Sequence, residues 1–484
     1  MLQCSFPLPS AWQITKRMKS RGIVLTVLAF LALSADLAGQ VIKVEGEGEG
    51  YAYEKIEVFL LSDPISARLN PVTVVKCDSA GKFSFEIPSA ERYTTLYLKT
   101  GAYLFKLLVS AGKEYRVSLP PYAPLKPEDA GNPFFSPATV VPFVVNDTTD
   151  INNLTGRFDK IYFGVMTGVS ERVANKTKLN EIPRLLESLN PVAGLSDNKF
   201  FRDYVTFRMI MLNTVSHGEY PGRKEDSVMI NMKFYPENPA CTDLIDYLFR
   251  DYFRVLLSGP VAMQLTAAIK NGSLPGFEEV FLKDGKAVNR ELQHYVVLLN
   301  MYNGFYNGLF DEGILSRVLD SAAANGATGY IRELASTLKE HVFRMKKGSV
   351  LPQFSLPDTS GKVVTPAAYR GKYLLVVFIG DTRQETLSEL SLLKSWYEKY
   401  RNKLSLAVIV TGREYGKIAG YFRQRGYRWN FLDASEAPFI TNQYEIRLLP
   451  GFILADPEGR LAEDYCPLPS ENLEGLIARL TGTG

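Results

Sequence analysis

Cysteine is scarce in this chain, and its distribution excludes the commonest dithiol chemistry. The 484 residues include only four cysteines, which are Cys4, Cys77, Cys241 and Cys466. No two of them stand in a C-x-x-C pair, and they are widely spaced. The sequence therefore contains no dithiol motif and does not indicate a disulfide framework. We expect Cys77, Cys241 and Cys466 to behave as small buried hydrophobic residues, with a single disulfide bridge as the alternative.

Histidine and the common catalytic motifs are equally sparse. The three histidines, His217, His294 and His341, lie too far apart in sequence to show metal-ligand spacing. The chain also has no G-x-S-x-G, H-E-x-x-H or P-loop motif, so a hydrolase centre in its middle region is not favoured. We therefore predict no metal site and no cofactor.

The N-terminus has the pattern of a secretory leader over residues 1–39. Basic residues precede the 12-residue apolar run Gly22–Leu33, and small residues follow it. The true start is plausibly Met18, and cleavage is expected near Gly39. The apolar run is too short to span a bilayer comfortably, so the mature chain is expected to have no transmembrane span. An uncleaved anchor is the alternative.

A strong net charge of either sign is also absent. Removing the leader takes away four basic residues and one acidic residue, which leaves 51 of each. A neutral chain without a basic run has no electrostatic footprint for nucleic acid, so no nucleic-acid partner is predicted.

What the chain does contain predicts a multidomain protein. Residues 40–120 alternate apolar and polar side chains in short runs such as Lys82–Ile87, which predicts an all-β sandwich. Residues 121–150 are rich in proline and are expected to form a linker. Residues 151–345 show helical periodicity, with single helices expected over stretches such as Pro239–Leu256.

The last segment, residues 346–484, alternates strand and helix patterns. The run Tyr373–Ile379 is continuously apolar, as expected for a strand that is buried on both faces, and Leu404–Val410 is a second such strand. Helical segments follow each of them. This alternation predicts a layered α/β fold.

Several short motifs in this segment match one family. Gly348–Leu356 reads G-x-x-x-P-x-F-x-L, Asp358–Lys362 reads D-x-x-G-K, and Tyr444–Leu454 has the tyrosine and proline of a later family motif. The segment resembles the TlpA/ResA-like and AhpC/TSA-like proteins of the thioredoxin superfamily in the bacterial cell envelope. The resemblance implies a thioredoxin-like fold for residues 346–484, preceded by a β-sandwich and a helical region. It also implies export across the inner membrane to the periplasm or the cell-envelope surface.

The family's Cys-x-x-Cys is missing from this segment. Alignment from Val376–Phe378 puts Arg383 at the place of the nucleophilic cysteine and Thr386 at the place of the resolving cysteine. A guanidinium stays protonated and is not a nucleophile. The resemblance therefore implies a degenerate active site with no confident catalytic residue.

The helix that follows this turn still has start signals. Thr382 with Glu385 three residues later would form a capping box, and Asp381 with Gln384 is a weaker alternative. The residue types thus predict that the helix start is kept although the thiols are absent.

The resemblance also implies a second half of the site. In the family a cis-proline faces the cysteine pair, and the backbone before it pairs with an extended peptide. The matching residues here are Leu449 and Pro450, followed by Gly451 instead of the usual Thr or Ser. We expect the remaining surface to comprise Asp381, Thr382, Arg383, Leu449 and Pro450.

Two functions fit these observations. The first is a redox-inactive binding or scaffold module whose partner is a protein, a peptide or a glycan of the cell envelope. The second is a thiol-disulfide oxidoreductase or peroxidase-like antioxidant protein, as the resemblance by itself would imply. The missing cysteines favour the first.

Overall fold

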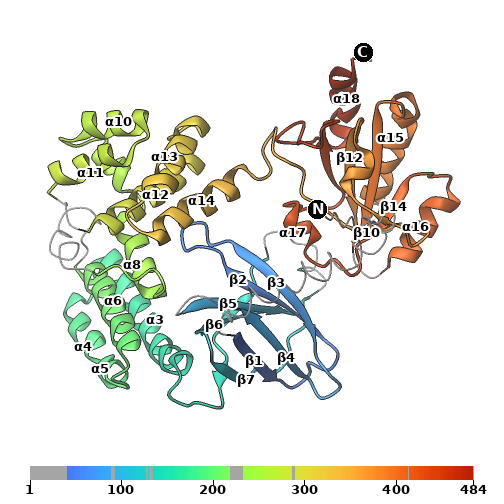
Figure 1. The fold of residues 1–484 in the computed structure, drawn as a ribbon. Helices are drawn as coiled ribbons and strands as arrows, with labels where there is room; N and C mark the ends of the chain where they lie inside the picture. Colours follow the sequence, from blue (N-terminus) through green and yellow to red (C-terminus); the bar gives the residue numbers. More distant parts are fainter. Residues whose placement is uncertain are drawn as a thin grey trace, which may run out of the picture.

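The computed structural model describes residues 41–88, 93–126, 129, 135–217, 233–285, 289–411 and 414–482. The predicted leader lies outside these residues. The described chain forms β-sheets, then a helical region, then an α/β domain (Figure 1). Within the described residues, no helix is both long enough and apolar enough to cross a bilayer.

The β region consists of two sheets with strand orders β4–β1–β7–β9 and β3–β2–β5–β6–β8. Their strands are β1 Val41–Glu47, β2 Lys55–Leu61, β3 Leu69–Lys76, β4 Lys82–Pro88, β5 Thr94–Thr100, β6 Tyr103–Val109, β7 Glu114–Ser118, β8 Ala138–Val140 and β9 Phe143–Val144. Strand β4 buries Phe83, Phe85 and Ile87 and exposes the residues between them. Both sheets contribute such alternate side chains to one shared core, as the sequence pattern predicted.

Two parts of this region differ from the sequence prediction. Strand β3 was not among the predicted strands, and it contains Pro71, which removes a ladder hydrogen-bond donor. The strand tolerates the proline because it is the edge of its sheet, and its register against β2 shifts between Val58 and Phe59. The proline-rich segment expected as a linker supplies the short strands β8 and β9, which pair with β6 and β7.

The first long helix, α3 (Ile151–Asn175), is joined to both sheets by two asparagines. The Asp150 side chain caps the helix by accepting the backbone N–H of Asn152. The Asn152 side chain then accepts the Leu108 N–H at 2.7 Å and donates to the Leu108 carbonyl at 2.8 Å. Asn153 makes the same pair of bonds with Val144. The helical region is therefore anchored to the β region by backbone-like hydrogen bonds.

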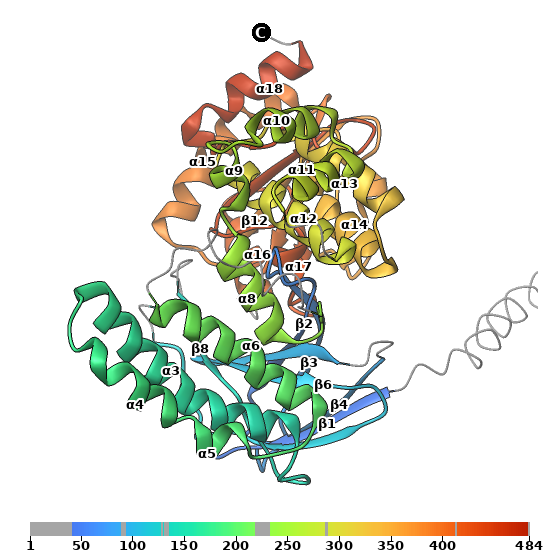
Figure 2. The ribbon, with the colours of Figure 1, turned by 90° about the vertical axis from the view of Figure 1, so that its left-hand side faces the viewer.

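The helical region forms one buried core. After α3 its elements are η1 Leu179–Glu181, α4 Ile182–Glu187, α5 Asn190–Ala193, α6 Lys199–Ser216, α8 Pro239–Phe249, α9 Tyr252–Leu256, α10 Ala262–Asn271, α11 Leu274–Lys283, α12 Arg290–Tyr306, α13 Glu312–Asn325 and α14 Gly329–Phe343. Figure 2 shows α3 to α6 beside the sheets and α9 to α14 above them, with α8 between the two groups.

The single helix predicted over Pro239–Leu256 is wrong, because the chain breaks between α8 and α9. The side chain of Asn300 on α12 is buried at this break. It donates to the Phe249 carbonyl at 2.8 Å and accepts the Phe253 N–H at 2.9 Å. These bonds satisfy backbone groups that a helix end leaves unpaired, so a distant residue stabilises the break.

The α/β domain has a four-stranded sheet with the order β14–β13–β12–β15, in which β15 runs antiparallel to β12. Its elements are β10 Leu356–Pro357, β11 Val363–Val364, η2 Pro366–Tyr369, β12 Tyr373–Ile379, α15 Gln384–Tyr400, β13 Leu404–Val410, α16 Tyr415–Gln424, β14 Asn430–Asp433, α17 Ile440–Gln443, β15 Gly451–Ala455, η3 Pro469–Glu471 and α18 Leu473–Thr481. The predicted buried strands are confirmed.

Strand β12 is the centre of this domain because both of its faces are covered. Leu375, Val377 and Ile379 contribute to the core on the side of α15, α16 and α18. The alternate residues Leu374, Val376 and Phe378 contribute to a second core with the entry segment and α17. The carboxyl ends of the parallel strands β12 and β13 lie together, where Thr411 N–H donates to the Ile379 carbonyl at 2.8 Å.

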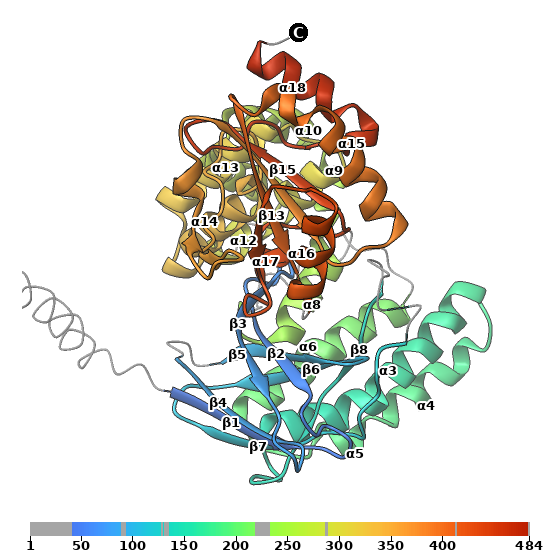
Figure 3. The same ribbon diagram turned by 90° about the vertical axis from the view of Figure 1, so that its right-hand side faces the viewer.

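One end of the β2–β3 pair reaches the α/β domain at α17 (Figure 3). The rings of Phe59 in β2 and Phe439 before α17 lie edge to face, with centroids 5.3 Å apart. All three regions of the chain therefore meet near this hairpin, beside the loop that leads into β15.

Candidate functional site

The turn after β12 is organised by the carboxylate of Asp381. Its Oδ1 accepts the backbone N–H of Arg383 at 3.0 Å and the hydroxyl of Thr386 at 2.9 Å. Its Oδ2 forms an ion pair with the Arg383 guanidinium. Asp381 thus holds both residues that stand at the cysteine places of the family motif.

The expected capping box on Thr382 is wrong. Helix α15 begins at Gln384, its N-cap residue is Arg383, and no side chain caps it at that residue. The Thr382 side chain makes no hydrogen bond within the described part of the chain. The Asp381 carboxylate stabilises the turn from two residues earlier, and a carboxylate at a helix N-terminus also interacts favourably with the helix dipole.

The surroundings of Asp381 favour its ionised form. Burial opposes ionisation, but the hydrogen bonds from the Arg383 N–H, the Arg383 side chain and the Thr386 hydroxyl outweigh it. The pKa of the Asp381 carboxyl is therefore lowered from its ordinary value. The site keeps a fixed negative charge at neutral pH, partly neutralised by Arg383.

The two residues at the cysteine places have opposite environments. The Arg383 side chain is 76% exposed, whereas Thr386 is 2% exposed and faces the core. Arg383 can therefore contact a ligand, and Thr386 has a structural position. Thr386 does not offer a group to an incoming molecule.

The loop before β15 packs against this turn. The Leu449–Pro450 peptide bond is cis, and Pro450 is buried. A Cβ atom added to Gly380 would lie 2.8 Å from Cδ1 of Leu449 and 3.3 Å from Oγ1 of Thr411, so the two loops are in close contact. Leu449 therefore lies against Gly380, the residue before Asp381, and the two loops adjoin at the carboxyl end of β12.

Apolar side chains are exposed next to this charged turn. Leu448 is 63% exposed and Leu449 is 41% exposed. Strand β15, which begins directly after them, lies at the edge of its four-stranded sheet. A sheet edge flanked by exposed apolar side chains is a common place for an extended peptide to pair.

The remaining thiol of the domain, Cys466, does not belong to this site. Its side chain packs against the core on the α15 and α18 side of the sheet. Burial raises the pKa of the Cys466 thiol to about 12. No two described cysteines lie at disulfide distance. Within the described residues, no group of His, Cys, Asp and Glu has the arrangement of a metal site.

The sequence did not reveal a cluster that supports the loop before β15. Glu445 accepts hydrogen bonds from Arg68 of the β2–β3 loop at 2.7 Å and from Arg344 after α14 at 3.1 Å. Residue 445 has a φ of +54°, in the left-handed region. Arg68 and Glu445 are 377 positions apart, so no local pattern could have predicted this contact.

A second cluster ties the same hairpin loop to α14. His341 is buried, with Nε2 3.2 Å from the hydroxyl of Ser62 and Nδ1 3.2 Å from that of Ser66. The Asp63 carboxylate lies 3.4 Å from Nδ1. These partners come from the β region, and no sequence pattern near His341 indicated them.

Comparisons with known proteins found similarity over about 27–28% of this chain. No family model matches the chain. A stretch of 137 residues, 27% of this chain, is 26% identical to the thiol-disulfide oxidoreductase ResA of Bacillus subtilis and spans 75% of that protein.

Two solved structures are also similar. They are the thioredoxin domain of a thiol-disulfide oxidoreductase from Bacteroides vulgatus, at 22% identity, and a thiol:disulfide interchange protein from Bacteroides sp., also at 22%. Each match covers 28% of this chain, with 96% and 90% of the other chain and TM-scores of 0.25 and 0.26. About 27% of this chain is therefore similar in sequence to a thiol-disulfide oxidoreductase of the ResA type, and we call the α/β domain the thioredoxin-like domain below.

Proposed function

We propose that this protein is a redox-inactive thioredoxin-like binding protein of the cell envelope. A leader over residues 1–39 would direct it across the inner membrane. The mature chain would consist of a β-sandwich, a helical domain and the thioredoxin-like domain. The observation that carries the proposal is the turn after β12, where Asp381 binds Arg383 and Thr386 at the places of the missing cysteines.

The chemistry of the turn supports binding rather than thiol exchange. Thiol-disulfide exchange needs a thiolate that attacks a disulfide sulfur, and neither a guanidinium nor a threonine hydroxyl can do so. Cys466 is kept in its thiol form by burial and lies apart from the turn. The surface at the turn instead offers an exposed cation, a fixed carboxylate and the apolar side chains Leu448 and Leu449.

This combination favours an extended protein segment as the ligand. The part of the β15 edge before Leu454, which already accepts the Ala462 N–H, would supply backbone hydrogen bonds. Leu448 and Leu449 would contact apolar side chains, and Arg383 would pair with an acidic group. The partner would be a protein or peptide of the cell envelope. A glycan is less well matched, because the described residues that we assign to this surface include no aromatic ring on which a sugar could stack.

An oxidoreductase assay tests the redox part of the proposal. We expect the purified mature chain to leave the rate of insulin reduction by dithiothreitol unchanged. Turnover that survives Cys466→Ala would contradict the proposal, and turnover lost with that substitution would identify a one-cysteine enzyme, which is the alternative function.

A quantitative pull-down from a cell-envelope extract tests the binding part. The double variant Arg383→Ala/Leu449→Ala removes both groups from the proposed surface. Arg401→Ala is the matched control, because this arginine is 67% exposed and follows the opposite end of α15 from the turn. A protein recovered by wild type and control but lost with the double variant would support the proposal. Equal recovery by all three would contradict the proposed surface.

A further inference from the structure

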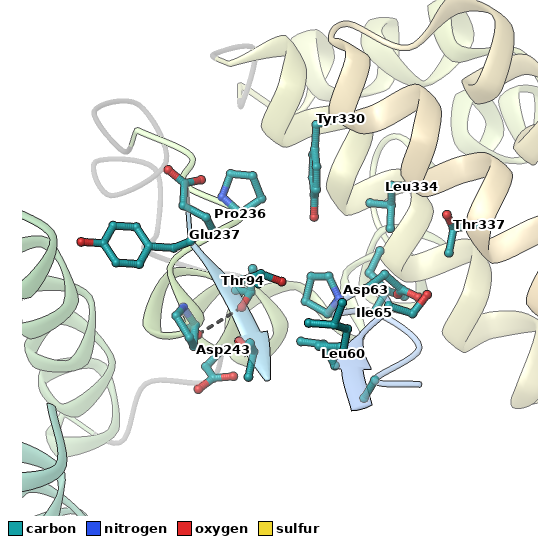
Figure 4. A pocket seen from close by; sticks show the side chains of 18 of the residues that line it. Leu60, Asp63, Ile65, Thr94, Pro236, Glu237, Asp243, Tyr330, Leu334 and Thr337 are labelled. Atoms are coloured by element: carbon teal, nitrogen blue, oxygen red, sulfur yellow. Dashed lines mark hydrogen bonds between the residues drawn. The ribbon is translucent and has the colours of Figure 1, made fainter. Parts of the chain in front are cut away.

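A second site lies between the β region and the helical region, away from the thioredoxin-like domain's turn. It is a cavity of about 590 Å³, within the roughly 300–1,000 Å³ range of small-ligand sites. Figure 4 shows Glu237 and Asp243 on one side of it and Tyr330, Leu334 and Thr337 of α14 on the other. The loop after β2 and the face of β5 and β6 complete the wall.

The lining is predominantly acidic. Five carboxylates line the cavity, from Asp63, Glu237, Asp243, Asp246 and Glu333, against two cations, from Lys106 and Arg250. Three of the carboxylates already have partners. Asp63 is hydrogen-bonded to Ser66, Asp243 pairs with Arg208 at 2.9 Å, and Asp246 pairs with Arg250. The net charge of the lining is therefore negative.

The other two carboxylates stand on opposite walls. Glu237 precedes α8, and Glu333 lies on α14. Neither side chain forms an ion pair or a hydrogen bond with any described residue. Lys106 also lines the cavity, but it does not form an ion pair with either of these carboxylates. Glu237 is half-buried and Glu333 is exposed, and among the described residues neither has a cationic partner that an external cation would have to displace.

Lys106 on β6 faces the same cavity and forms no ion pair within the described chain. Burial lowers the pKa of its ammonium, and the Asp243 carboxylate opposes that effect. The other charged groups that act on it are Arg208 of α6, which also lowers the pKa, and Asp159 of α3, which raises it. When protonated, Lys106 repels a cationic ligand in the cavity.

Aromatic side chains complete the chemistry of the lining. Tyr93 and Tyr97 come from the β region, and Tyr330 comes from α14. The faces of tyrosine rings attract cations, and they also pack against the methylene stems of long basic side chains. Rings and free carboxylates together match an ammonium or guanidinium group on an aliphatic stem.

We propose that this cavity, lined by Glu237, Glu333 and tyrosine rings between the β and helical regions, binds a ligand that bears ammonium or guanidinium groups. A short peptide rich in Arg or Lys and a free polyamine share this chemistry. The site is separate from the proposed peptide surface of the thioredoxin-like domain, so either can fail without the other.

Isothermal titration of the mature chain tests this. The probes are acetyl-Arg-Gly-Arg amide, spermidine and acetyl-Glu-Gly-Glu amide. We expect the two cations to bind and the acidic peptide not to bind. A preference for the arginine peptide would assign the site to peptides, and a preference for spermidine would assign it to polyamines. Absence of binding by both cations at millimolar concentration, or tighter binding of the acidic peptide, would overturn the proposal.

Charge variants locate the binding. Glu237→Gln and Glu333→Gln should each weaken cation binding about three- to five-fold, as for exposed ion pairs, and the double variant by about ten-fold. Glu340→Gln, an exposed glutamate on the same helix α14 that does not line the cavity, is the matched control and should leave the affinity unchanged. Equal losses in control and double variant would refute the site.

Lys106→Met gives a test with the opposite sign. Removal of the like charge should tighten binding of the arginine peptide several-fold. Weaker binding of the arginine peptide by this variant would contradict the proposal. If the variant does not fold, the wild type provides the same test, because affinity for the permanently charged arginine peptide should rise with pH as Lys106 loses its proton. A fall in affinity with rising pH would contradict the proposal.

Discussion

The contact of Glu445 with two arginines gives a quantitative prediction about how the thioredoxin-like domain is held. Glu445 precedes the loop that carries Leu449, and its carboxylate binds Arg68 of the β region and Arg344 of the helical region. We predict that Glu445→Gln loosens the attachment of the β2–β3 loop to the thioredoxin-like domain. The substitution keeps the shape of the side chain and removes its charge.

The size of the effect follows from how buried the cluster is. The three side chains are 28–30% exposed, between a fully exposed pair and a buried one. Exposed pairs contribute about 0–1 kcal/mol, and breaking a buried pair costs about 3–5 kcal/mol. For two contacts at this depth, to which glutamine can still accept a hydrogen bond, we expect a loss of about 1–2 kcal/mol in the free energy of local opening.

Hydrogen exchange measures this loss directly. Within the loop, Ser62 N–H donates to the Arg68 carbonyl at 2.8 Å, so a peptide spanning residues 62–68 reports opening. A loss of 1–2 kcal/mol should accelerate its exchange by about 5- to 30-fold. Glu436→Gln is the control, because Glu436 is exposed in the same domain and has no partner among the described residues. Exchange in Glu445→Gln within two-fold of the control would refute the reasoning.

Three further predictions concern stability and reactivity. Leu375 is fully buried in β12, so Leu375→Ala should lower the free energy of unfolding by about 2–5 kcal/mol in urea titrations. A loss below about 1 kcal/mol would show that the strand is not packed as described. Lowering the pH from 7 to 5 should destabilise the protein through His294. Burial lowers the pKa of this ring below its ordinary 6.5, so the unfolded state binds the proton first, and urea titrations of His294→Gln should show a weaker pH dependence. The ring also accepts the Ala327 N–H at Nδ1, which protonation would prevent. Native Cys466, which is half-buried, should react with iodoacetamide at pH 8 more slowly than in the unfolded chain, because burial raises the pKa of its thiol. Equal labelling rates of the two states, read by mass spectrometry, would contradict this.

The thioredoxin-like domain was largely predictable from local patterns. A strand buried on both faces must be apolar at every position, so Tyr373–Ile379 and Leu404–Val410 could be located by composition alone. The missing dithiol is a property of the sequence itself. The predicted proximity of Asp381, Arg383 and Leu449 depended on the family resemblance, and the packing of Leu449 on Gly380 agrees with it.

Other features depended on contacts that have no local signature. The break between α8 and α9 is stabilised by Asn300, which lies 51 positions after Phe249. The predicted cap at Thr382 does not form, because the Asp381 carboxylate accepts the Arg383 N–H in this turn. Strand β3 contains Pro71, which is disfavoured in central strands, and only the sheet order shows that it is an edge.

The sequence by itself determined the order of the regions, the buried strands of the thioredoxin-like domain and the absence of its thiols, because periodicity and residue identity are local properties of the chain. The tertiary structure alone decided which charged groups meet. It placed Glu445 between Arg68 and Arg344, and it left Glu237 and Glu333 facing one cavity without partners in the described chain. The physical reason is that ion pairing depends on distances between side chains far apart in sequence, which are fixed only when the hydrophobic cores pack.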